Sequence, residues 1–290
     1  MAGQGLRGEN RHLARRVAFV TGASRGIGKA SAVALAQAGF DVALCARSQR
    51  EGERREHSPT LRSSDTRPIP GSLETTARLV TGEGREALLL PMDLLEPGSV
   101  ESAASETLAR WGHVDVLVNN AVYTGPGNLD RCLDLPLDVF ERIFRANVFS
   151  PLQLTQRLLP AMLERGCGTI INVTSHVAQH DPPAAAGEGG WGLGYAASKG
   201  AFHRMVGILA IEHADSGLRF YNLDPGFVVT ESMQQHLEEQ GFGALRGAPP
   251  AVPAAGVAWL ATSPEAARSS GTTIMAQKLC ADRGLVPDWP

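Results

Sequence analysis

The sequence is poor in several residue patterns that mark particular classes of protein. Its four cysteines (Cys45, Cys132, Cys167 and Cys280) are scattered without a C-x-x-C pair, which argues against a zinc site and against a disulfide framework. The eight histidines include neither an H-E-x-x-H motif nor a ligand-like cluster, so we expect no metal. Scattered cysteines are typical of a reducing compartment, and we therefore expect a cytoplasmic protein.

Long apolar runs and an excess of charge are also missing. No stretch of 18 apolar residues occurs, so we expect no membrane-spanning helix. The net charge of −3 gives no general attraction to nucleic acid or to an anionic membrane. The start, MAGQGLRGENRHLARR, carries arginines without an apolar core, so it is not a secretory signal. We expect residues 1–12 to be a flexible tail; a short targeting sequence is the alternative.

Short aliphatic segments alternate with helical patterns from residue 17 to about residue 276. Their continuous apolarity is typical of strands buried on both faces of a parallel sheet. Because no linker interrupts the pattern, it predicts that residues 13–290 form a single α/β domain, a Rossmann-like doubly wound seven-stranded parallel sheet with helices on both faces. The predicted strands are 17–22, 41–47, 86–93, 114–121, 168–175, 218–226 and 271–276. The predicted helices are 26–39, 73–84, 98–111, 138–164, 195–214 and 250–262.

A glycine-rich turn joins the first predicted strand to the first helix in VAFVTGASRGIGKA. Gly22, Gly26 and Gly28 allow a tight turn, close approach of the backbone to a pyrophosphate, and close packing of helix on strand. The free N–H groups at the start of the helix favour an anion. Because strand and helix supply the context that the motif requires, we predict a dinucleotide site; a purely structural turn is the alternative.

The end of the second predicted strand indicates which dinucleotide is bound. In such folds an acidic side chain there holds the ribose 2′-hydroxyl, whereas an arginine tolerates a 2′-phosphate. The strand ends ALCAR, with Arg47 and no acid before Glu51, and Arg25 in the glycine turn offers a second guanidinium. We therefore predict NADP(H) in preference to NAD(H); the alternative is that both arginines are simply solvated.

Two long loops break the alternation of strands and helices. Residues 48–72 are polar and follow Arg47 directly, so they form either a flap over the adenosine phosphate or a solvated, mobile loop. Residues 176–194 are rich in proline, alanine and glycine and precede the last motif of the chain. Within them Trp191 either roofs a substrate site, which would favour a bulky apolar substrate, or packs its own surface loop.

A tyrosine and a lysine stand four residues apart in GYAASKG, although the chain has only three of each. Positions i and i+4 share one face of a helix, so the side chains of Tyr195 and Lys199 can meet. A free tyrosine has a pKa of about 10, and a neighbouring ammonium favours the phenolate and lowers that pKa. The pair is a candidate for proton transfer; two unrelated helix-surface residues are the alternative.

Five motifs occur in order along the chain: TGASRGIG at 21–28, NNA at 119–121, Asn147, Ser175 and YAASK at 195–199. In this order they resemble the short-chain dehydrogenase/reductase family, an NAD(P)-dependent oxidoreductase group, over about residues 13–276. The cofactor-binding residues that the resemblance and the glycine turn imply are Gly22, Ser24, Arg25, Gly26, Ile27, Gly28, Arg47, Asp93, Leu94, Asn120, Ala121, Tyr195, Lys199, Pro225, Gly226, Val228 and Thr230.

The resemblance also implies a reaction that interconverts a carbonyl and a hydroxyl group of a small or medium organic substrate. Tyr195 would give a proton to the carbonyl oxygen in reduction and take one in oxidation. Ser175 would hydrogen-bond that oxygen, Lys199 would hold the nicotinamide ribose, and Asn147 would fix a water that links Lys199 to solvent. The alternatives are a strand-end cap for Ser175, satisfaction of buried backbone for Asn147, and a turn-forming role for Asp93.

Some features depart from the family pattern. Val122 stands where the NNAG motif has glycine, and the interval between Ser175 and Tyr195 is longer than usual. Residues 277–290 lack the glycine-rich finish of oxoacyl reductases, which argues against fatty-acid synthesis. We expect these residues to be a tail that covers the pocket or a neighbouring subunit. By analogy we expect a homodimer or homotetramer formed through the long helices.

Two other functions compete with the oxidoreductase. The first is a non-catalytic dinucleotide-binding sensor or scaffold, against which the complete Ser–Tyr–Lys set argues. The second is a related enzyme that epimerises or dehydrates a nucleotide sugar. Those relatives carry a larger C-terminal substrate domain, for which little sequence remains after residue 230.

Overall fold

A seven-stranded parallel sheet organises the chain, of which the computed structural model describes residues 15–234, 247–287 and 289. The strand order is β3-β2-β1-β4-β5-β6-β7, so the order reverses beside β1, as in doubly wound folds. The predicted fold class is confirmed; the predicted tail, residues 1–12, lies outside the described residues. The strands are β1 (Arg16–Thr21), β2 (Phe40–Ala46), β3 (Ala87–Pro91), β4 (Val116–Asn119), β5 (Gly168–Val173), β6 (Leu218–Asp224) and β7 (Thr273–Met275).

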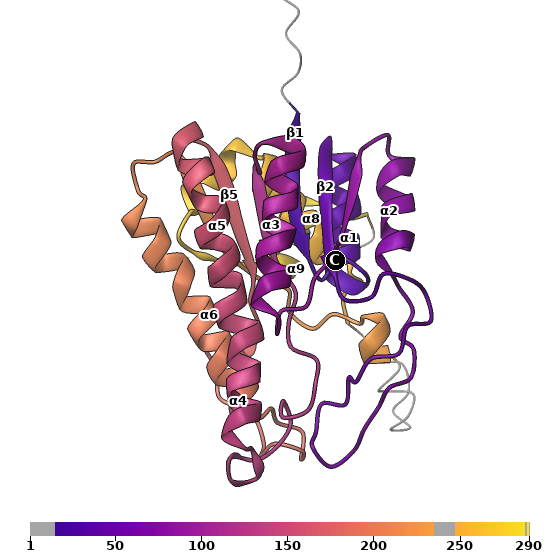
Figure 1. The fold of residues 1–290 in the computed structure, drawn as a ribbon. Coiled ribbons are helices and arrows are strands. Elements are labelled where there is room, and N and C mark those ends of the chain that lie inside the picture. Colours follow the sequence, from indigo (N-terminus) through magenta and orange to yellow (C-terminus); the bar gives the residue numbers. More distant parts are fainter. Residues whose placement is uncertain (1–14, 235–246, 288, 290) are drawn as a thin grey trace, which may run out of the picture.

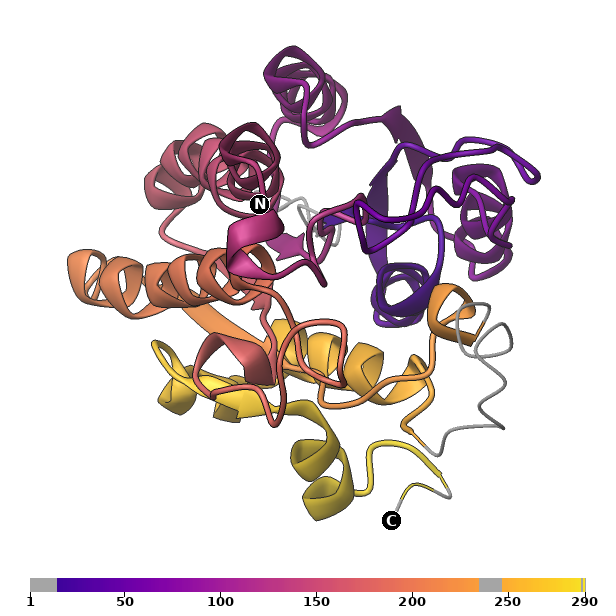
Figure 2. The same cartoon turned by 90° about the horizontal axis from the view of Figure 1, so that it is seen from below.

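Helices cover both faces of the sheet (Figure 1). On one face α3 packs beside α5, with α6 next to them, and on the other face α1 lies against α2 and α8. Figure 2 looks along the strands from below. The helices are α1 (Gly26–Gln37), α2 (Leu73–Gly82), α3 (Pro97–Trp111), α4 (Leu137–Phe144), α5 (Ser150–Arg165), α6 (Leu193–Glu212), α8 (Ala251–Thr262) and α9 (Ala276–Arg283).

Two hydrophobic clusters fill the space between the sheet and the helices. Successive side chains of a strand point to opposite faces, so Val17 and Phe19 join one cluster while Ala18 and Val20 join the other. All four side chains are fully buried, and burial of a large aliphatic or aromatic side chain contributes about 1.5–3 kcal/mol. This two-sided burial explains why the strands have continuous apolar sequences.

The helix predicted over residues 138–164 is interrupted in the structure. Helix α4 runs into a π-helical turn, Arg145–Phe149, before α5 begins at Ser150. A π-turn inserts one residue into the helical ladder and is frequent at functional sites. The apolar periodicity of the segment gives no signal for it.

The C-terminal segment 277–290 contains most of α9, where the sequence suggested only a tail. Beyond the helix, Leu285, Val286 and Trp289 pack with Val228 in a small separate cluster. Because Val228 follows β6 at the rim of the sheet, this cluster supports the carboxyl edge. The segment covers a neighbouring part of its own chain.

The connection between β2 and α2, residues 47–72, is a long irregular loop (Figure 1). It is held at its middle by Asp130, whose carboxylate accepts hydrogen bonds from Thr60 Oγ1 (2.8 Å) and the Leu61 backbone N–H (2.9 Å). Asp130 is 1 % exposed. The loop is therefore packed against the segment after β4.

Among the described helices, none combines the length and apolarity needed to cross a membrane.

Candidate active site

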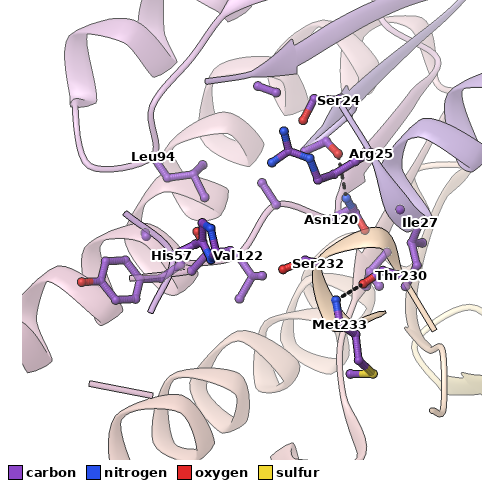
Figure 3. Close-up of a pocket in the computed structure, with 18 of the residues that line it drawn as sticks. Ser24, Arg25, Ile27, His57, Leu94, Asn120, Val122, Thr230, Ser232 and Met233 are labelled. Atoms are coloured by element: carbon purple, nitrogen blue, oxygen red, sulfur yellow. Dashed lines mark hydrogen bonds between the residues drawn. The ribbon is translucent and has the colours of Figure 1, made fainter. Parts of the chain in front are cut away.

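A cavity of about 710 Å³ lies at the carboxyl edge of the sheet, where open α/β proteins bind their ligands. Figure 3 shows the glycine turn, with Ser24 and Ile27, on one side of it and His57 on the other. Gly28 and Asn147 do not line it. The predicted site residues that do are Gly22, Ser24, Arg25, Gly26, Ile27, Arg47, Asp93, Leu94, Asn120, Ala121, Ser175, Tyr195, Lys199, Pro225, Gly226, Val228 and Thr230.

The glycine turn is shaped by close backbone contacts. A Cβ atom on Gly28 would lie 2.1 Å from the carbonyl oxygen of Gly22, so only glycine allows this packing of α1 on β1. Gly28 thus supports the turn from behind. Asn120 Nδ2 donates to the Thr21 carbonyl (2.9 Å) and ties the end of β4 to the turn. These contacts leave an open, rigid cradle in front of the α1 N-terminus, which fits a pyrophosphate.

A carboxylate from a distant segment reaches the start of α1. Glu231 Oε2 accepts a hydrogen bond from the Gly26 N–H (2.9 Å), and its other oxygen forms an ion pair with Lys29. These hydrogen bonds lower the pKa of Glu231 despite its partial burial. The segment after β6 is therefore fastened to the first free N–H of the helix, the kind of group that favours an anion.

The two predicted arginines have different surroundings. Arg25 Nη2 donates to the carbonyls of Ile69 (3.1 Å) and Gly71 (2.9 Å), so its guanidinium is bonded to the loop before α2. Burial lowers the pKa of Arg25 from its ordinary value. Arg47, in contrast, donates from Nη2 to Thr124 Oγ1 (3.0 Å) and lines the cavity at the end of β2. Both arginines line the cavity, and the guanidinium of Arg25 is in addition held by the loop before α2.

Ser175, Tyr195 and Lys199 all line the cavity. Ser175 follows β5, and Tyr195 lies in the first turn of α6. Lys199 lies one turn further along and is 5 % exposed, and its Nζ donates to the Val173 carbonyl at 3.0 Å. The i, i+4 spacing therefore brings both side chains to the cavity.

The pKa values of this group are governed by burial. The pKa of Tyr195 is raised above its ordinary value, because loss of solvent outweighs the lowering effect of the Ser175 hydrogen bond. The pKa of Lys199 is lowered to about 8, again by burial, with Asp224 opposing the shift. The sequence led us to expect that Lys199 together with an oxidised nicotinamide lowers the pKa of Tyr195. In the protein alone, burial raises it.

Asn147 sits in the π-turn, 3 % exposed, behind the cavity wall. Its Oδ1 accepts from the Tyr123 backbone N–H (2.7 Å), and its Nδ2 donates to Ser198 Oγ (2.9 Å). The structure therefore shows the alternative that the sequence left open for Asn147, satisfaction of buried backbone. This contact fixes the chain after β4 relative to α6.

Asp93 and Pro225, two further predicted residues, both line the cavity and lie in turns. Asp93 Oδ1 accepts from the Leu95 N–H (2.9 Å), so Asp93 forms the turn that the sequence left open as an alternative and also lines the cavity. At the opposite rim, Gln277 Nε2 donates to the carbonyls of Pro225 (3.0 Å) and Phe227 (3.1 Å). Gln277 was not singled out from the sequence, because only the fold brings α9 to this turn.

The loop of residues 47–72 supplies cavity residues that the sequence did not reveal. His57, Arg55 and Ile69 line the cavity, and the Ile69 carbonyl accepts from Arg25 of the glycine turn. His57 is 5 % exposed, with its Nε2 3.0 Å from the Arg67 carbonyl. The length of the loop was the available signal, since long loops in compact domains are usually functional or disordered. In the described part of the chain no cluster of His, Cys, Asp or Glu is arranged to hold a metal ion.

Sequence comparison finds a clear set of relatives. Residues 16–241 match the family model described as short chain dehydrogenase. An uncharacterized oxidoreductase from Bacillus subtilis, YhdF, is 30% identical over 268 residues, which cover 90% of this chain and 82% of the relative. Dehydrogenase/reductase SDR family member 7B of Rattus norvegicus is 30% identical over 236 residues, 81% of this chain, but the match spans only 65% of that longer protein.

Solved structures of the same family share the fold. A metagenomic short-chain oxidoreductase in complex with NADP superposes with a TM-score of 0.68 at 26% identity, covering 90% of this chain and 96% of that one. A short chain dehydrogenase from Mycobacterium paratuberculosis bound to NAD superposes with a TM-score of 0.69 at 24% identity, over 90% and 95% of the two chains. Sheet order, site geometry and sequence matches agree: the chain belongs to the short-chain dehydrogenase/reductase family of oxidoreductases.

Proposed function

We propose that the protein is an NADP(H)-dependent oxidoreductase that interconverts a carbonyl and a hydroxyl group of a small or medium organic substrate. One observation carries this proposal: Ser175, Tyr195 and Lys199 line the same cavity as the glycine turn at the start of α1. A nicotinamide dinucleotide held by the glycine turn would supply or accept the hydride of this reaction.

Each of the three side chains has a distinct part in this reaction. Tyr195 donates its hydroxyl proton to the carbonyl oxygen of the substrate during reduction and takes one up during oxidation. Ser175 holds the same oxygen by a hydrogen bond and stabilises the charge that develops on it. Lys199 holds the nicotinamide ribose, and its ammonium favours return of a proton to the pair.

The preference for NADP(H) rests on Arg47. It stands at the end of β2, with the Nη2 of Arg55 donating to its backbone carbonyl (3.2 Å), so two guanidinium groups line this end of the cavity. Glu53 also lines it, but that carboxylate is paired with Arg55 at 2.8 Å. A 2′-phosphate beside Arg47 would be matched by a guanidinium, which binds phosphate with good geometry.

The surface of the long helices supports the expectation of a homodimer or homotetramer. Ile208 and Ile211, one turn apart on α6, are 46 % and 80 % exposed. Exposed large apolar side chains that adjoin one another on a helix are typical of a contact surface. All four cysteines are unpaired, which fits the proposed cytoplasmic location.

Replacement of Tyr195 by phenylalanine tests the proposal. Tyr195→Phe should lower kcat for NADPH-dependent ketone reduction by about 10²- to 10⁴-fold, because the proton donor is removed while the ring keeps its place. Cofactor affinity, measured by NADPH fluorescence titration, should stay within about twofold of the wild type. Undiminished turnover in this variant would refute the mechanism. Tight NADPH binding by the wild type without turnover on a broad ketone panel would favour a sensor.

A further inference from the structure

Asp224, the last residue of β6, is a buried carboxylate that the proposed reaction does not use. Its side chain is 5 % exposed, and its Oδ1 accepts a hydrogen bond from the Gly226 N–H (2.9 Å). A buried carboxylate is costly unless hydrogen bonds or an opposite charge compensate it. The groups that surround Asp224 therefore decide what it does.

The alternation of side chains along β6 places Asp224 on the face of the sheet that α6 covers. Phe220 packs in the hydrophobic cluster that contains Val206 of α6. Every second side chain of a strand points to the same face, so Asn222 and Asp224 also face this helix. Asn222 shows the contact directly, because its Nδ2 donates to the His203 carbonyl at 2.8 Å.

The same geometry brings Asp224 level with Lys199. Asp224 lies two residues beyond Asn222, about 6.6 Å further along the strand towards the carboxyl edge. Lys199 precedes His203 by one helical turn, about 6 Å along the helix axis. Helix α6 begins at the carboxyl edge, where Tyr195 lines the cavity, so both steps run in the same direction.

The hydrogen bonds of β5 agree with this placement. Lys199 Nζ donates to the Val173 carbonyl at 3.0 Å. Val173 is the register partner of Leu223, and the following N–H, that of Thr174, donates to the Leu223 carbonyl at 2.9 Å. The ammonium therefore lies where the neighbouring strand passes from Leu223 to Asp224.

The charge of Asp224 acts on both side chains of the proton-transfer pair. Burial lowers the pKa of Lys199 to about 8, and Asp224 opposes this lowering. Burial raises the pKa of Tyr195, and Asp224 raises it further. A negative charge favours the protonated form of each group, the ammonium and the neutral phenol.

The other titratable groups near Lys199 do not supply this effect. Burial lowers the pKa of His203, so its ring is neutral near pH 7. His176, in the turn after β5, stacks on His180 with ring centroids 3.6 Å apart. Arg204 on α6 is exposed. Among the described residues, Asp224 is the charged group that shifts the pKa of Lys199.

We propose that Asp224 is a positioning residue of the reaction, a buried negative charge behind Lys199 that keeps Tyr195 and Lys199 in their protonated forms. Asp224 does not line the cavity, so it acts through the two residues that do. This inference rests on the proposed function and adds to it a residue that sets the pH range of ketone reduction.

Urea unfolding between about pH 6 and pH 10 measures the coupling without turnover. The gap in free energy of unfolding between Lys199→Met and the wild type should close above about pH 8, because the folded protein has then released a proton that the unfolded chain keeps. The gap between Asp224→Asn and Asp224→Asn/Lys199→Met should close about one to two pH units lower. Asp41→Asn, which changes a buried carboxylate at the start of β2, is the matched control background and should not move this pH.

The pH dependence of ketone reduction tests the consequence for the reaction. At saturating NADPH, kcat/KM for a panel of simple ketones should fall on the alkaline side as Lys199 releases its proton. In Asp224→Asn this fall should begin about one to two pH units lower. The loss at pH 8 should be about tenfold or more and should shrink as the pH is lowered. Asp224→Glu, which keeps the charge, should return the fall towards its wild-type position.

Two results would overturn the inference. One is a gap that closes at the same pH in the wild-type and Asp224→Asn backgrounds. The other is a loss of kcat/KM in Asp224→Asn that is equal at every pH, because this would indicate a structural role. If Asp224→Asn does not fold, Asp224→Ser takes its place, since a hydroxyl also accepts from the Gly226 N–H. A wild type that reduces no ketone would refute the proposed function, while the unfolding measurements would still decide whether Asp224 acts on Lys199.

Discussion

The two edges of the sheet surround their charged side chains differently. At the amino edge, Asp115 accepts hydrogen bonds from the Val17 backbone N–H (2.7 Å) and from Arg165 (2.8 Å). At the carboxyl edge, the ammonium of Lys199 is buried and donates to the neutral Val173 carbonyl (3.0 Å). The same strands therefore run from an end where a carboxylate meets a guanidinium to an end where a buried ammonium meets a backbone carbonyl.

Other residues of the amino edge show the same pairing. Asp41 at the start of β2 accepts from the Glu86 backbone N–H (2.8 Å) and forms ion pairs with Arg15 (3.2 Å) and Arg85 (3.0 Å). A carboxylate shared by several donors on adjacent segments fixes where the strands begin. This comparison teaches that one edge stabilises the fold, while the other holds a buried charge that burial disfavours.

The strongest test of this comparison is to remove the buried charge at the carboxyl edge. Lys199→Met should raise the free energy of unfolding at pH 7 by about 2–4 kcal/mol, because burial lowers the pKa of Lys199 to about 8 and so penalises the ammonium. The variant should lose activity at the same time. Urea unfolding of both proteins measures the difference in stability.

The pH dependence of that difference identifies its cause. Between about pH 8 and the ordinary lysine pKa of 10.5, the unfolded chain still holds the proton that the folded protein has released. As the pH rises through this window, the free energy of unfolding of the wild type therefore increases, and the gap between it and that of Lys199→Met closes. A gap that stays constant with pH would show that packing, and not charge, causes it. Lys278→Met, at an exposed position, is the control.

The opposite effect on stability is expected at the amino edge, where removal of a paired charge should destabilise the protein. Asp115→Ala should lower the free energy of unfolding by about 2–3 kcal/mol, because it leaves a backbone N–H and a guanidinium without their acceptor. The activity per folded molecule should remain that of the wild type. The exposed Asp215→Ala serves as control. A loss of kcat in Asp115→Ala without loss of stability would contradict the division between the edges.

A smaller effect is expected at Arg47, which we propose to bind the 2′-phosphate of NADPH. Arg47→Asp should lower the ratio of kcat/KM with NADPH to kcat/KM with NADH by about 10- to 100-fold, the loss of one charge-assisted hydrogen bond. Arg50→Asp is the matched control, because Arg50 is exposed on the same loop and pairs with Glu74. An unchanged ratio in Arg47→Asp would mean that the 2′-phosphate is recognised elsewhere.

The smallest expected effect concerns Glu231, the carboxylate at the start of α1. Glu231→Gln should tighten NADPH binding about two- to fivefold, because it removes a negative charge from a helix N-terminus that favours anions. The same change at Glu74, in the first turn of α2, should leave the affinity unaltered. Weaker binding in Glu231→Gln, measured by fluorescence titration, would show that the carboxylate supports the cavity wall instead.

The fold and the inner part of the site could be predicted because their signals are local. Burial on both faces gives strands their continuous apolar sequences, and the glycine turn and the Tyr195–Lys199 spacing each lie within one short segment. The orientation of Arg25 could not be predicted, because it depends on carbonyls of a loop more than forty positions away.

The tether at Asp130 has a consequence for how the cavity opens. One carboxylate accepts hydrogen bonds from both Thr60 and Leu61, so the loop between β2 and α2 is attached at its middle to the segment after β4. Movement of either half of the loop away from the cavity requires these hydrogen bonds to break. The width of the entrance is therefore set by a residue that touches neither reactant.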